Sequence, residues 1–325
     1  MQREEVIIIG GGPCGMSCAI ALQKQGIRPL IIEKGNVVQT IYKFPTHQTF
    51  FSSSEKLEIG DFPFITEKQK PVRIQALAYY REVAKRSNLR INTFENALEI
   101  VKQDDYFMIK TIDNQDKIKE YAAEQIVVAT GYYDQPNFMH VPGEDLAKVS
   151  HYFKEGHPYY NKDVVIIGGK NSAVDAALEL HHAGANITVL YRGETYSSSI
   201  KPWILPDFES LVNKDIIKMV FQAHIDKITH EYVYYRVNGE QKKVKSDFVF
   251  AMTGYRPNVE LLNHAGVHIN KENGKPQYNE ETMESNIDGL YIAGVVAAGN
   301  NNNEIFIENG QFHGQLIAQA IKNKR

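Results

Sequence analysis

The sequence predicts an α/β fold, because a strand, a glycine-rich turn and a helix follow one another twice along the chain. The two copies lie at residues 6–25 and 164–182, and each is followed by a further apolar strand, at 29–32 and at 187–190. Strands that alternate with helices in this order build a parallel sheet with helices on its faces. We therefore expect two α/β domains, each with a glycine-rich turn at the end of its first strand.

The composition is that of a globular protein and limits the kinds of partner. The 325 residues suggest about two domains of about 150 residues each. The net charge of −3 argues against a nucleic-acid partner, and the longest apolar runs are much shorter than the roughly 20 residues of a membrane-spanning helix. The opening MQREEV lacks the apolar segment of a secretory signal, and two cysteines cannot form a disulfide framework. We expect a cytoplasmic protein with no membrane partner, and nothing in the sequence predicts a metal site.

The first turn carries the glycine pattern of a dinucleotide site. Gly10, Gly12 and Gly15 give the spacing GxGxxG between a strand and a helix, and Pro13 fits the first helical position. Such glycines permit a tight turn and let the backbone approach a pyrophosphate, which the positive end of the helix dipole attracts. Glu33 ends the next strand, about 20 residues later, where an acid binds ribose hydroxyls. The alternative is a plain strand-to-helix turn, but the acid favours a dinucleotide.

The second turn departs from this pattern. Gly168 fits the first glycine and Ala173 the last small residue, but Lys170 stands at the position of the second glycine. Its side chain either obstructs the phosphates or contacts them through its ammonium group. We expect Asn171 and Ser172, at the start of the following helix, to contact the same ligand.

The end of the second copy's last strand indicates which dinucleotide binds there. Arg192 stands where an acid would bind the ribose of NAD, and an arginine accommodates the 2′-phosphate of NADPH instead. Lys201 and the serines at 197–199 follow on the same loop and are expected to reach that phosphate. A solvated surface arginine is the alternative. The contrast with Glu33 assigns FAD to the first copy and NADPH to the second, which indicates a flavin-dependent reductase.

Three further segments resemble the pyridine nucleotide–disulfide reductase family, in its thioredoxin-reductase-like branch. They are IVVATG at 126–131 with the prolines that follow it, FAMTGYRPN at 250–258 and GLYIAG at 289–294. The resemblance implies an FAD domain of residues 1–150 and 254–325, with an NADPH domain of residues 151–253 inserted. Both would be Rossmann-like domains with a parallel central sheet. The resemblance also implies domain rotation during hydride transfer and a homodimer or higher homo-oligomer.

The predicted cofactor contacts extend beyond the two turns. For FAD they are Gly10, Gly12, Pro13, Cys14, Gly15, Glu33, Lys34, Gln39, His47, Thr130, Gly131, Gly294 and Ile305. For NADPH they are Gly168, Lys170, Asn171, Ser172, Ala173, Arg192, Lys201 and Gly254.

Two departures from the family pattern bear on the chemistry. Neither the segment 150–157 nor the segment 37–50 contains the cysteine pair that family members use to relay electrons to a disulfide. In addition, the family motif AGD reads Ala293-Gly294-Val295, which removes the aspartate that binds the flavin's ribityl hydroxyls. We expect backbone N–H groups or polar residues of 300–304 to take over this role.

Five segments together resemble one subgroup, the bacillithiol disulfide reductases: GGGPCG, EKGNVV, FPTHQTFFSSSEKLEIGDFPF, IIGGKNSA and AGVVAAGNNNNEIFIENGQFHG. The resemblance implies an FAD enzyme that uses NADPH to reduce a small-molecule disulfide and regenerate the thiol bacillithiol. It also implies that Cys14 is the redox cysteine.

The residues themselves leave the role of Cys14 open. A helix N-terminus lowers a thiol pKa, but a bound pyrophosphate raises it again. The turn also belongs beneath the pyrophosphate, far from the isoalloxazine where electrons leave FAD. Cys14 is therefore either the reactive thiol or a small packed residue, as we expect for the buried Cys18. In the second case the disulfide is reduced at the flavin itself, in a pocket shaped by His47, Gln48 and Tyr132.

Two competing functions remain compatible with the sequence. A ferredoxin or flavodoxin NADP⁺ reductase has the same architecture and needs no cysteine pair. A non-enzymatic redox sensor would bind both dinucleotides and signal by domain rotation.

Overall fold

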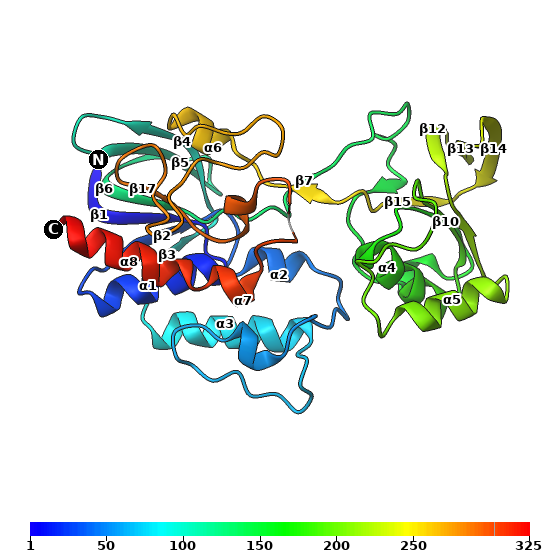
Figure 1. The fold of residues 1–325 in the computed structure, drawn as a ribbon, viewed down its shortest axis with the longest axis horizontal. Helices are drawn as coiled ribbons and strands as arrows, with labels where there is room; N and C mark the ends of the chain where they lie inside the picture. Colours follow the sequence, from blue (N-terminus) through cyan, green and yellow to red (C-terminus); the bar gives the residue numbers. More distant parts are fainter. Residues whose placement is uncertain (302) are drawn as a thin grey trace. The chain divides into compact units, whose positions relative to one another are not determined.

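The computed structural model describes residues 1–301 and 303–325, which form two compact units (Figure 1). The first unit comprises Met1–Lys43, Gln48–Gln135 and Tyr255–Arg325, and the second comprises Phe44–His47 and Pro136–Gly254. The chain leaves the first unit within the short strand β7 (Gln135–Pro136) and returns to it just before β16 (Tyr255–Arg256).

The first unit contains a seven-stranded sheet. Its strands are β1 (Gln2–Ile9), β2 (Leu30–Glu33), β3 (Arg90–Thr93), β4 (Glu95–Lys102), β5 (Phe107–Asp113), β6 (Ile118–Val128) and β17 (Leu290–Ile292). The order is β3-β2-β1-β6-β5-β4, and β17 also pairs with β6. The pairs among β1, β2, β3, β6 and β17 are parallel, whereas β4–β5 and β5–β6 are antiparallel. The sheet is therefore mixed and not wholly parallel as predicted, because residues 95–128 return through two hairpins.

Helices cover this sheet and bring its glycine-rich turn into place. The α-helices are α1 (Pro13–Lys24), α2 (Gln39–Lys43), α3 (Arg73–Arg86), α6 (Glu260–His264), α7 (Ile307–Gly310) and α8 (His313–Lys324), and the 3-10 helices are η1 (Ser54–Leu57) and η3 (Gly294–Ala298). Figure 1 shows α1 and α8 side by side along the sheet. Val6–Ile9 of β1 are at most 4% exposed, as expected for a parallel strand with both faces covered.

The second unit has the same layered construction. Its strands β8 (Val149–Ser150), β9 (Asp163–Ile167), β10 (Asn186–Leu190), β11 (Ile217–Val220) and β15 (Phe248–Ala251) form a parallel sheet in the order β11-β10-β9-β15-β8. The helices are η2 (His157–Tyr159), α4 (Asn171–His182) and α5 (Leu205–Asn213). A separate antiparallel sheet consists of β12 (His224–Ile228), β13 (Tyr232–Val237) and β14 (Glu240–Lys245).

The unit boundaries differ from the predicted domain boundaries at residues 136–150, at Phe44–His47 and, by one residue, at Gly254, which belongs to the second unit. Residues 136–150 belong to the second unit because β8, at their end, pairs with β15 of the second sheet. Phe44–His47 also belong to the second unit, where Thr46 N–H donates to the carbonyl of Lys154 at 2.7 Å. The first boundary thus lies after residue 135, where we predicted 150. Which dinucleotide each unit holds remains a prediction at this stage.

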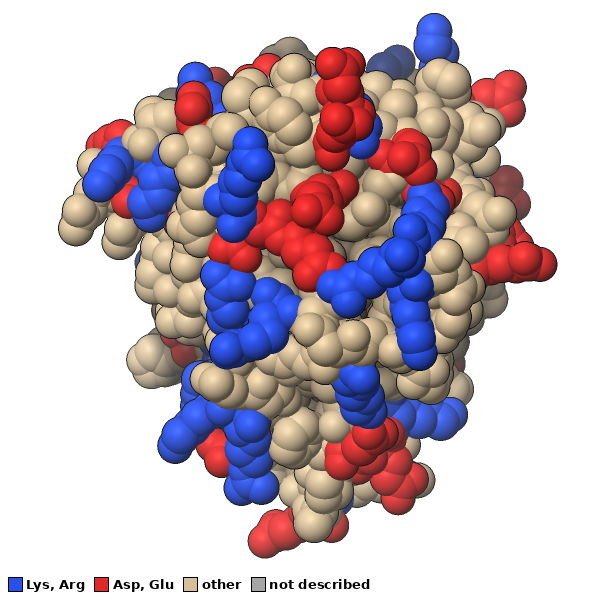
Figure 2. Space-filling model, turned by 90° about the vertical axis from the view of Figure 1, so that its left-hand side faces the viewer, with Lys and Arg blue, Asp and Glu red and all other residues tan. Residues whose placement is uncertain are grey.

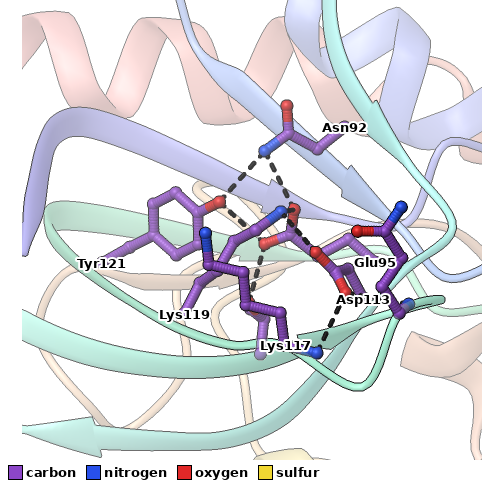
Figure 3. Close-up of polar contacts among 8 residues, drawn as sticks. Asn92, Glu95, Asp113, Lys117, Lys119 and Tyr121 are labelled. Carbon is purple, nitrogen blue, oxygen red and sulfur yellow. Dashed lines mark hydrogen bonds and ion pairs between the residues drawn. The ribbon is translucent and has the colours of Figure 1, made fainter.

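A buried carboxylate joins β3 to the antiparallel strands of the first sheet. Glu95 is 1% exposed and accepts hydrogen bonds from Thr111, Tyr121 and Asn92 and an ion pair from Lys119 at 3.0 Å (Figure 3). Burial would raise the pKa of Glu95, but these hydrogen bonds outweigh it and lower the pKa. A carboxylate with so many partners is a structural link and leaves no proton to exchange with a substrate.

Charges of both signs alternate on the end of the first unit that carries both chain termini (Figure 2). Arg325 pairs with Glu5, and Lys324 pairs with Glu284 and with Asp288. This face therefore has no field of a single sign. No helix within residues 1–301 and 303–325 is long and apolar enough to span a membrane, and the same residues contain no cluster of three His, Cys, Asp or Glu side chains suited to a metal ion.

Candidate functional site

The turn after β1 has a geometry that only glycine allows at two positions. Gly10 has φ of +114°, and a Cβ there would collide with the carbonyl of Ala129. A Cβ on Gly15 would collide with the carbonyl of Gly10, so the first turn of α1 packs directly on the end of the strand. Pro13 occupies the first turn of α1, where no backbone N–H is needed. These contacts explain three of the predicted FAD-binding positions.

Space for a ligand opens beside the same turn. A Cβ on Gly12 or Gly131 would meet no atom of the described residues within 4 Å. The hydroxyl of Thr130 is buried and has no hydrogen-bond partner in the described part of the chain. A bare backbone at a helix N-terminus, with an unsatisfied hydroxyl nearby, fits a phosphate-containing cofactor.

The carboxylate of Glu33 is held at the base of the turn. Its Oε2 accepts the N–H of Gly11 and its Oε1 accepts the N–H of Gly35, both at 2.7 Å, and the residue is 6% exposed. Burial raises the pKa of Glu33, and the two backbone N–H groups oppose this rise. Each oxygen keeps a second lone pair, which suits the hydroxyl pair of a ribose.

Lys34 and Gln39, two further predicted FAD contacts, are bound to neighbouring segments. Lys34 and Lys43 each pair with a different oxygen of Asp134 at 2.6 Å. Burial would raise the pKa of Asp134, but the two lysines outweigh it and lower the pKa. Gln39 Oε1 accepts the N–H of Asn36 at 3.2 Å. Sequence patterns gave no signal for Asp134, because its partners Lys34 and Lys43 lie far away in the sequence.

Two backbone segments converge on Cys14. A Cβ on Gly294 or on Gly310 would lie 3.0 Å from Cys14 Sγ, so the start of η3 and the end of α7 both pack against the thiol. Ile305, a predicted FAD contact, packs against Gly310 as well. Gly294 has φ of +74°, and its N–H donates to His313 Nδ1 at 3.2 Å. The segment Ala293-Gly294-Val295, which lacks the family aspartate, is therefore held by the imidazole of His313 at the start of α8.

The environment of Cys14 keeps its thiol protonated at neutral pH. Burial raises the pKa of Cys14 to about 12, and the negative charge of Glu308 adds to the rise. The helix N-terminus, which by itself lowers a thiol pKa, does not offset these effects. Cys14 still keeps partial exposure, whereas Cys18 is fully buried and its pKa is raised by burial and by Cys14.

Sequence reasoning missed two polar residues around α7, the short helix that packs on Cys14 through Gly310. Glu308 lies on α7, two residues before Gly310, and Ser52 donates a hydrogen bond from its hydroxyl to Glu308 Oε1. The charge of Glu308 also raises the pKa of the buried Tyr80, after burial itself. These residues are far apart in the sequence and belong to no spaced motif, so only the fold brings them together.

In the second unit, the position that corresponds to Glu33 lies directly after β10, one residue earlier than the predicted Arg192. The first glycine of each turn fixes which residues correspond. Gly10 N–H donates to the carbonyl of Ile32, directly before Glu33, at 2.9 Å, and Gly168 N–H donates to the carbonyl of Leu190, directly before Tyr191, at 3.0 Å. The structural counterpart of Glu33 is therefore Tyr191, and Arg192 lies one residue beyond it. The error arose because strand ends were placed from hydropathy, which does not fix pairing register.

The ring of Tyr191 covers the second turn. A Cβ on either Gly169 or Gly193 would collide with this ring, so the aromatic side chain packs between two bare backbone segments. The first glycine, Gly168, has φ of +141°. An aromatic residue in place of an acid offers no carboxylate for the ribose hydroxyl pair that NAD would present.

Exposed polar residues surround the N-terminus of α4. Lys170 is its N-cap residue, and Lys170, Ser172 and Arg192 are exposed, whereas Ala173 is buried. These positions can therefore contact a ligand as predicted.

Lys201, a predicted phosphate contact, is already paired with a carboxylate of the second unit. Its ammonium pairs with Asp175 of α4 at 2.7 Å, its N–H donates to Asn171 Oδ1 at 2.7 Å, and the residue is 8% exposed. These contacts hold the loop that carries Lys201 against α4. The carboxylate of Asp175 also balances the lysine's positive charge.

The remaining predicted residues are distributed over both units. His47 belongs to the second unit, whereas Gln48 and Tyr132, with which it was expected to shape a pocket, belong to the first. Gly254 has φ of +90° and its carbonyl accepts the N–H of Asn137. In the segment 300–304, Asn300 N–H donates to the carbonyl of Asn273 at 2.7 Å, while Asn302 lies outside the described residues.

Replacement of the exposed arginine at the second turn tests the assignment of its ligand. We expect Arg192→Ala to raise the KM for NADPH about ten- to hundredfold, because a charge-assisted phosphate contact contributes about 1.5–3 kcal/mol. The KM for NADH should change little. Arg236→Ala, which removes another exposed arginine of the same unit, is the matched control. An unchanged preference between NADPH and NADH in Arg192→Ala would remove this residue from the site.

Comparisons with known proteins agree with this architecture. The chain matches the family described as pyridine nucleotide-disulphide oxidoreductase over residues 7–294. It is 61% identical over 327 aligned positions to the bacilliredoxin reductase Bdr of Bacillus subtilis (strain 168), covering 100% of this chain and 99% of the relative. The solved bacillithiol disulfide reductase Bdr of Bacillus cereus has a TM-score of 0.98 at 60% identity, with 100% of both chains covered. The thioredoxin reductase of T. acidophilum shares the fold, with a TM-score of 0.77 at 20% identity over 100% of this chain and 99% of that one. The predicted α/β fold with two Rossmann-like domains is confirmed.

Proposed function

Because the chain belongs to the pyridine nucleotide-disulphide oxidoreductase family, we propose that it reduces a low-molecular-weight disulfide, bacillithiol disulfide, and regenerates the thiol. The chain is an FAD-containing, NADPH-dependent oxidoreductase. NADPH supplies a hydride, the bound flavin passes two electrons on, and the disulfide accepts them. The observation that carries the substrate is the 60% identity, over 100% of both chains, to the solved bacillithiol disulfide reductase Bdr of Bacillus cereus.

The two turns divide the cofactors between the units in this proposal. The first unit holds FAD through the bare turn at Gly12, the fixed carboxylate of Glu33 and the open position at Gly131. The second unit holds NADPH through the N-terminus of α4 and the exposed Arg192. Glu33 in the first unit would accept the ribose hydroxyls of FAD, whereas Arg192 in the second unit would contact the 2′-phosphate of NADPH.

The cysteines restrict how a disulfide is reduced. The chain contains two cysteines, Cys14 and Cys18, and both lie on α1, one turn apart. Neighbours at this spacing on one helix are poorly placed to form a disulfide, so a dithiol relay of the usual family type is absent. In the proposed reaction Cys14 acts alone: it forms a mixed disulfide with one half of the substrate, and its partial exposure gives a small molecule access.

Anaerobic reduction of the purified protein tests this function directly. We expect NADPH to bleach the flavin absorbance at 1:1 stoichiometry, and bacillithiol disulfide to restore it. In steady state, NADPH should be consumed with bacillithiol disulfide and not with flavodoxin. Consumption with flavodoxin alone would indicate an NADP⁺ reductase for electron carriers, and consumption with neither would indicate a sensor.

The proposal extends to assembly and compartment. We propose a homodimer or higher homo-oligomer, because the family resemblance implies one, and light scattering of the same preparation measures its mass. The cytoplasm is the proposed compartment, since a thiol-regenerating enzyme belongs where thiols are kept reduced.

A further inference from the structure

The two glycine-rich turns of this chain can be compared position by position. Glu33-Lys34-Gly35 in the first unit corresponds to Tyr191-Arg192-Gly193 in the second, because the first glycine of each turn donates its N–H to the residue directly before the stretch. One residue after that first glycine, Gly11 corresponds to Gly169. Differences between the two copies therefore show how the second site departs from the first.

An aromatic ring in the second unit takes the place of a carboxylate in the first. Glu33 joins two glycines of the first unit, whose N–H groups it accepts at 2.7 Å each. At the corresponding positions of the second unit, a Cβ on Gly169 or on Gly193 would collide with the ring of Tyr191. The ring therefore fills the space between these two glycines, at the position where the first unit holds its ribose-binding acid.

The backbone on both sides of Arg192 is fixed to the segment 220–223. Tyr191 forms two backbone hydrogen bonds with this segment and Gly193 accepts a third, all at 2.9 Å. The side chain of Arg192 is exposed and forms no ion pair within residues 1–301 and 303–325, whereas its counterpart Lys34 is paired with a carboxylate. The guanidinium thus starts from a fixed backbone and stays available to an anion.

NADPH and NADH differ at one group of the adenine ribose, which carries a 2′-phosphate in NADPH and a hydroxyl in NADH. A carboxylate at position 191 would accept the hydroxyl, but it would repel the phosphate and compensate the charge of Arg192. An uncharged ring has neither of these effects. It also offers no carboxylate to the hydroxyl pair of NADH.

We propose that Tyr191 determines the selectivity for NADPH over NADH. Its ring, packed between Gly169 and Gly193, replaces the ribose-binding acid and positions Arg192 for the 2′-phosphate. The inference rests on the proposed assignment of NADPH to the second unit. It makes Tyr191 a specificity-determining residue that acts partly through its neighbour.

Tyr191→Glu tests this role through binding, without turnover. Calorimetry of the purified flavoprotein measures the affinities for NADP⁺ and for NAD⁺. We expect the affinity for NADP⁺ to fall about ten- to hundredfold, because like charges would face each other, and the affinity for NAD⁺ to rise. In stopped-flow reduction of the flavin, the NADPH concentration that gives half of the limiting rate should rise by the same factor, while the limiting rate is retained.

Three companion variants make the comparison specific. Tyr191→Phe keeps the ring and should retain the preference for NADP⁺. In a Tyr191→Ala background, Arg192→Ala should weaken NADP⁺ binding by a smaller factor than it does in the parent protein, because the arginine is no longer held in place. Tyr160→Glu is the matched control: Tyr160 is 71% exposed and precedes β9, whereas the turn follows the end of that strand. This control should bind both dinucleotides as the parent does.

The outcomes separate this inference from the proposed function. An unchanged ratio of the two affinities in Tyr191→Glu, or an equal loss of both, overturns the role of Tyr191 in selectivity. Equal effects of Arg192→Ala in both backgrounds overturn its positioning role, and this cycle decides if Tyr191→Glu does not fold. None of these measurements uses a disulfide. A parent protein that consumes no NADPH with bacillithiol disulfide therefore contradicts the proposed function and leaves this inference standing.

Discussion

Gly12→Trp should purify with little or no flavin. Gly12 has ordinary backbone torsions, with φ of −78°, and a side chain there meets open space, so the substitution is not expected to strain the turn. That open space is where we place the cofactor's pyrophosphate, and an indole fills it. We expect FAD affinity to fall at least about a hundredfold, equivalent to about 2.8 kcal/mol. The measurement is the ratio of flavin to protein absorbance after purification and after addition of FAD.

A second tryptophan variant distinguishes a blocked cofactor site from a general loss of folding. Lys322→Trp introduces the same side chain at an exposed position near the end of α8 and should retain the parent flavin content. Thermal unfolding of Gly12→Trp without added FAD should match that of the parent apoprotein. If Gly12→Trp purifies with full flavin stoichiometry, the cofactor does not approach the chain at this turn.

The sequence was sufficient for the fold where local chemistry dictates the backbone. Gly10 and Gly15 must be glycine because other backbone atoms occupy the place of a Cβ, and this requirement is visible as the GxGxxG spacing. Glu33 was found for the same reason, since it ends the strand that pairs with β1. Residues that are tied to a turn by a short stretch of chain can be located from spacing alone.

Pairing register and long-range contacts could not be read in this way. Arg192 was assigned the position that Tyr191 holds, because a one-residue shift at a strand end leaves the hydrophobic pattern almost unchanged. Lys201 looked like a free cation, but Asp175 on α4 neutralises it. Glu308 carries no local signal either, because its hydrogen-bond partner Ser52 lies far away in the sequence.

Cys14→Ala is expected to abolish turnover with bacillithiol disulfide while leaving reduction of the flavin by NADPH intact. The sulfur is the atom that bonds to the substrate in the proposed reaction, so no other side chain replaces it. Alanine leaves space between Gly294 and Gly310 and introduces no clash, which should preserve the cofactor turn. The measurements are steady-state NADPH consumption, stopped-flow flavin reduction and the mass of the protein after incubation with the disulfide.

Cys18→Ala is the matched control, because Cys18 lies one turn further along the same helix and is fully buried. It should lose some stability through a small cavity and keep its turnover.

The pH dependence of the parent protein gives a second, independent test of the Cys14 thiol. Its pKa is raised from 9.0 to about 12, so the thiol is protonated at neutral pH and the thiolate fraction grows about tenfold per pH unit below that value. Alkylation of Cys14 should follow this slope across pH 7–10, and so should formation of the mixed disulfide, because the thiolate is the nucleophile in both reactions. If Cys14→Ala retains most of its turnover, the sulfur only fills the space between the two glycines. In that case the disulfide is reduced at the flavin, and Cys14 takes no part in the chemistry.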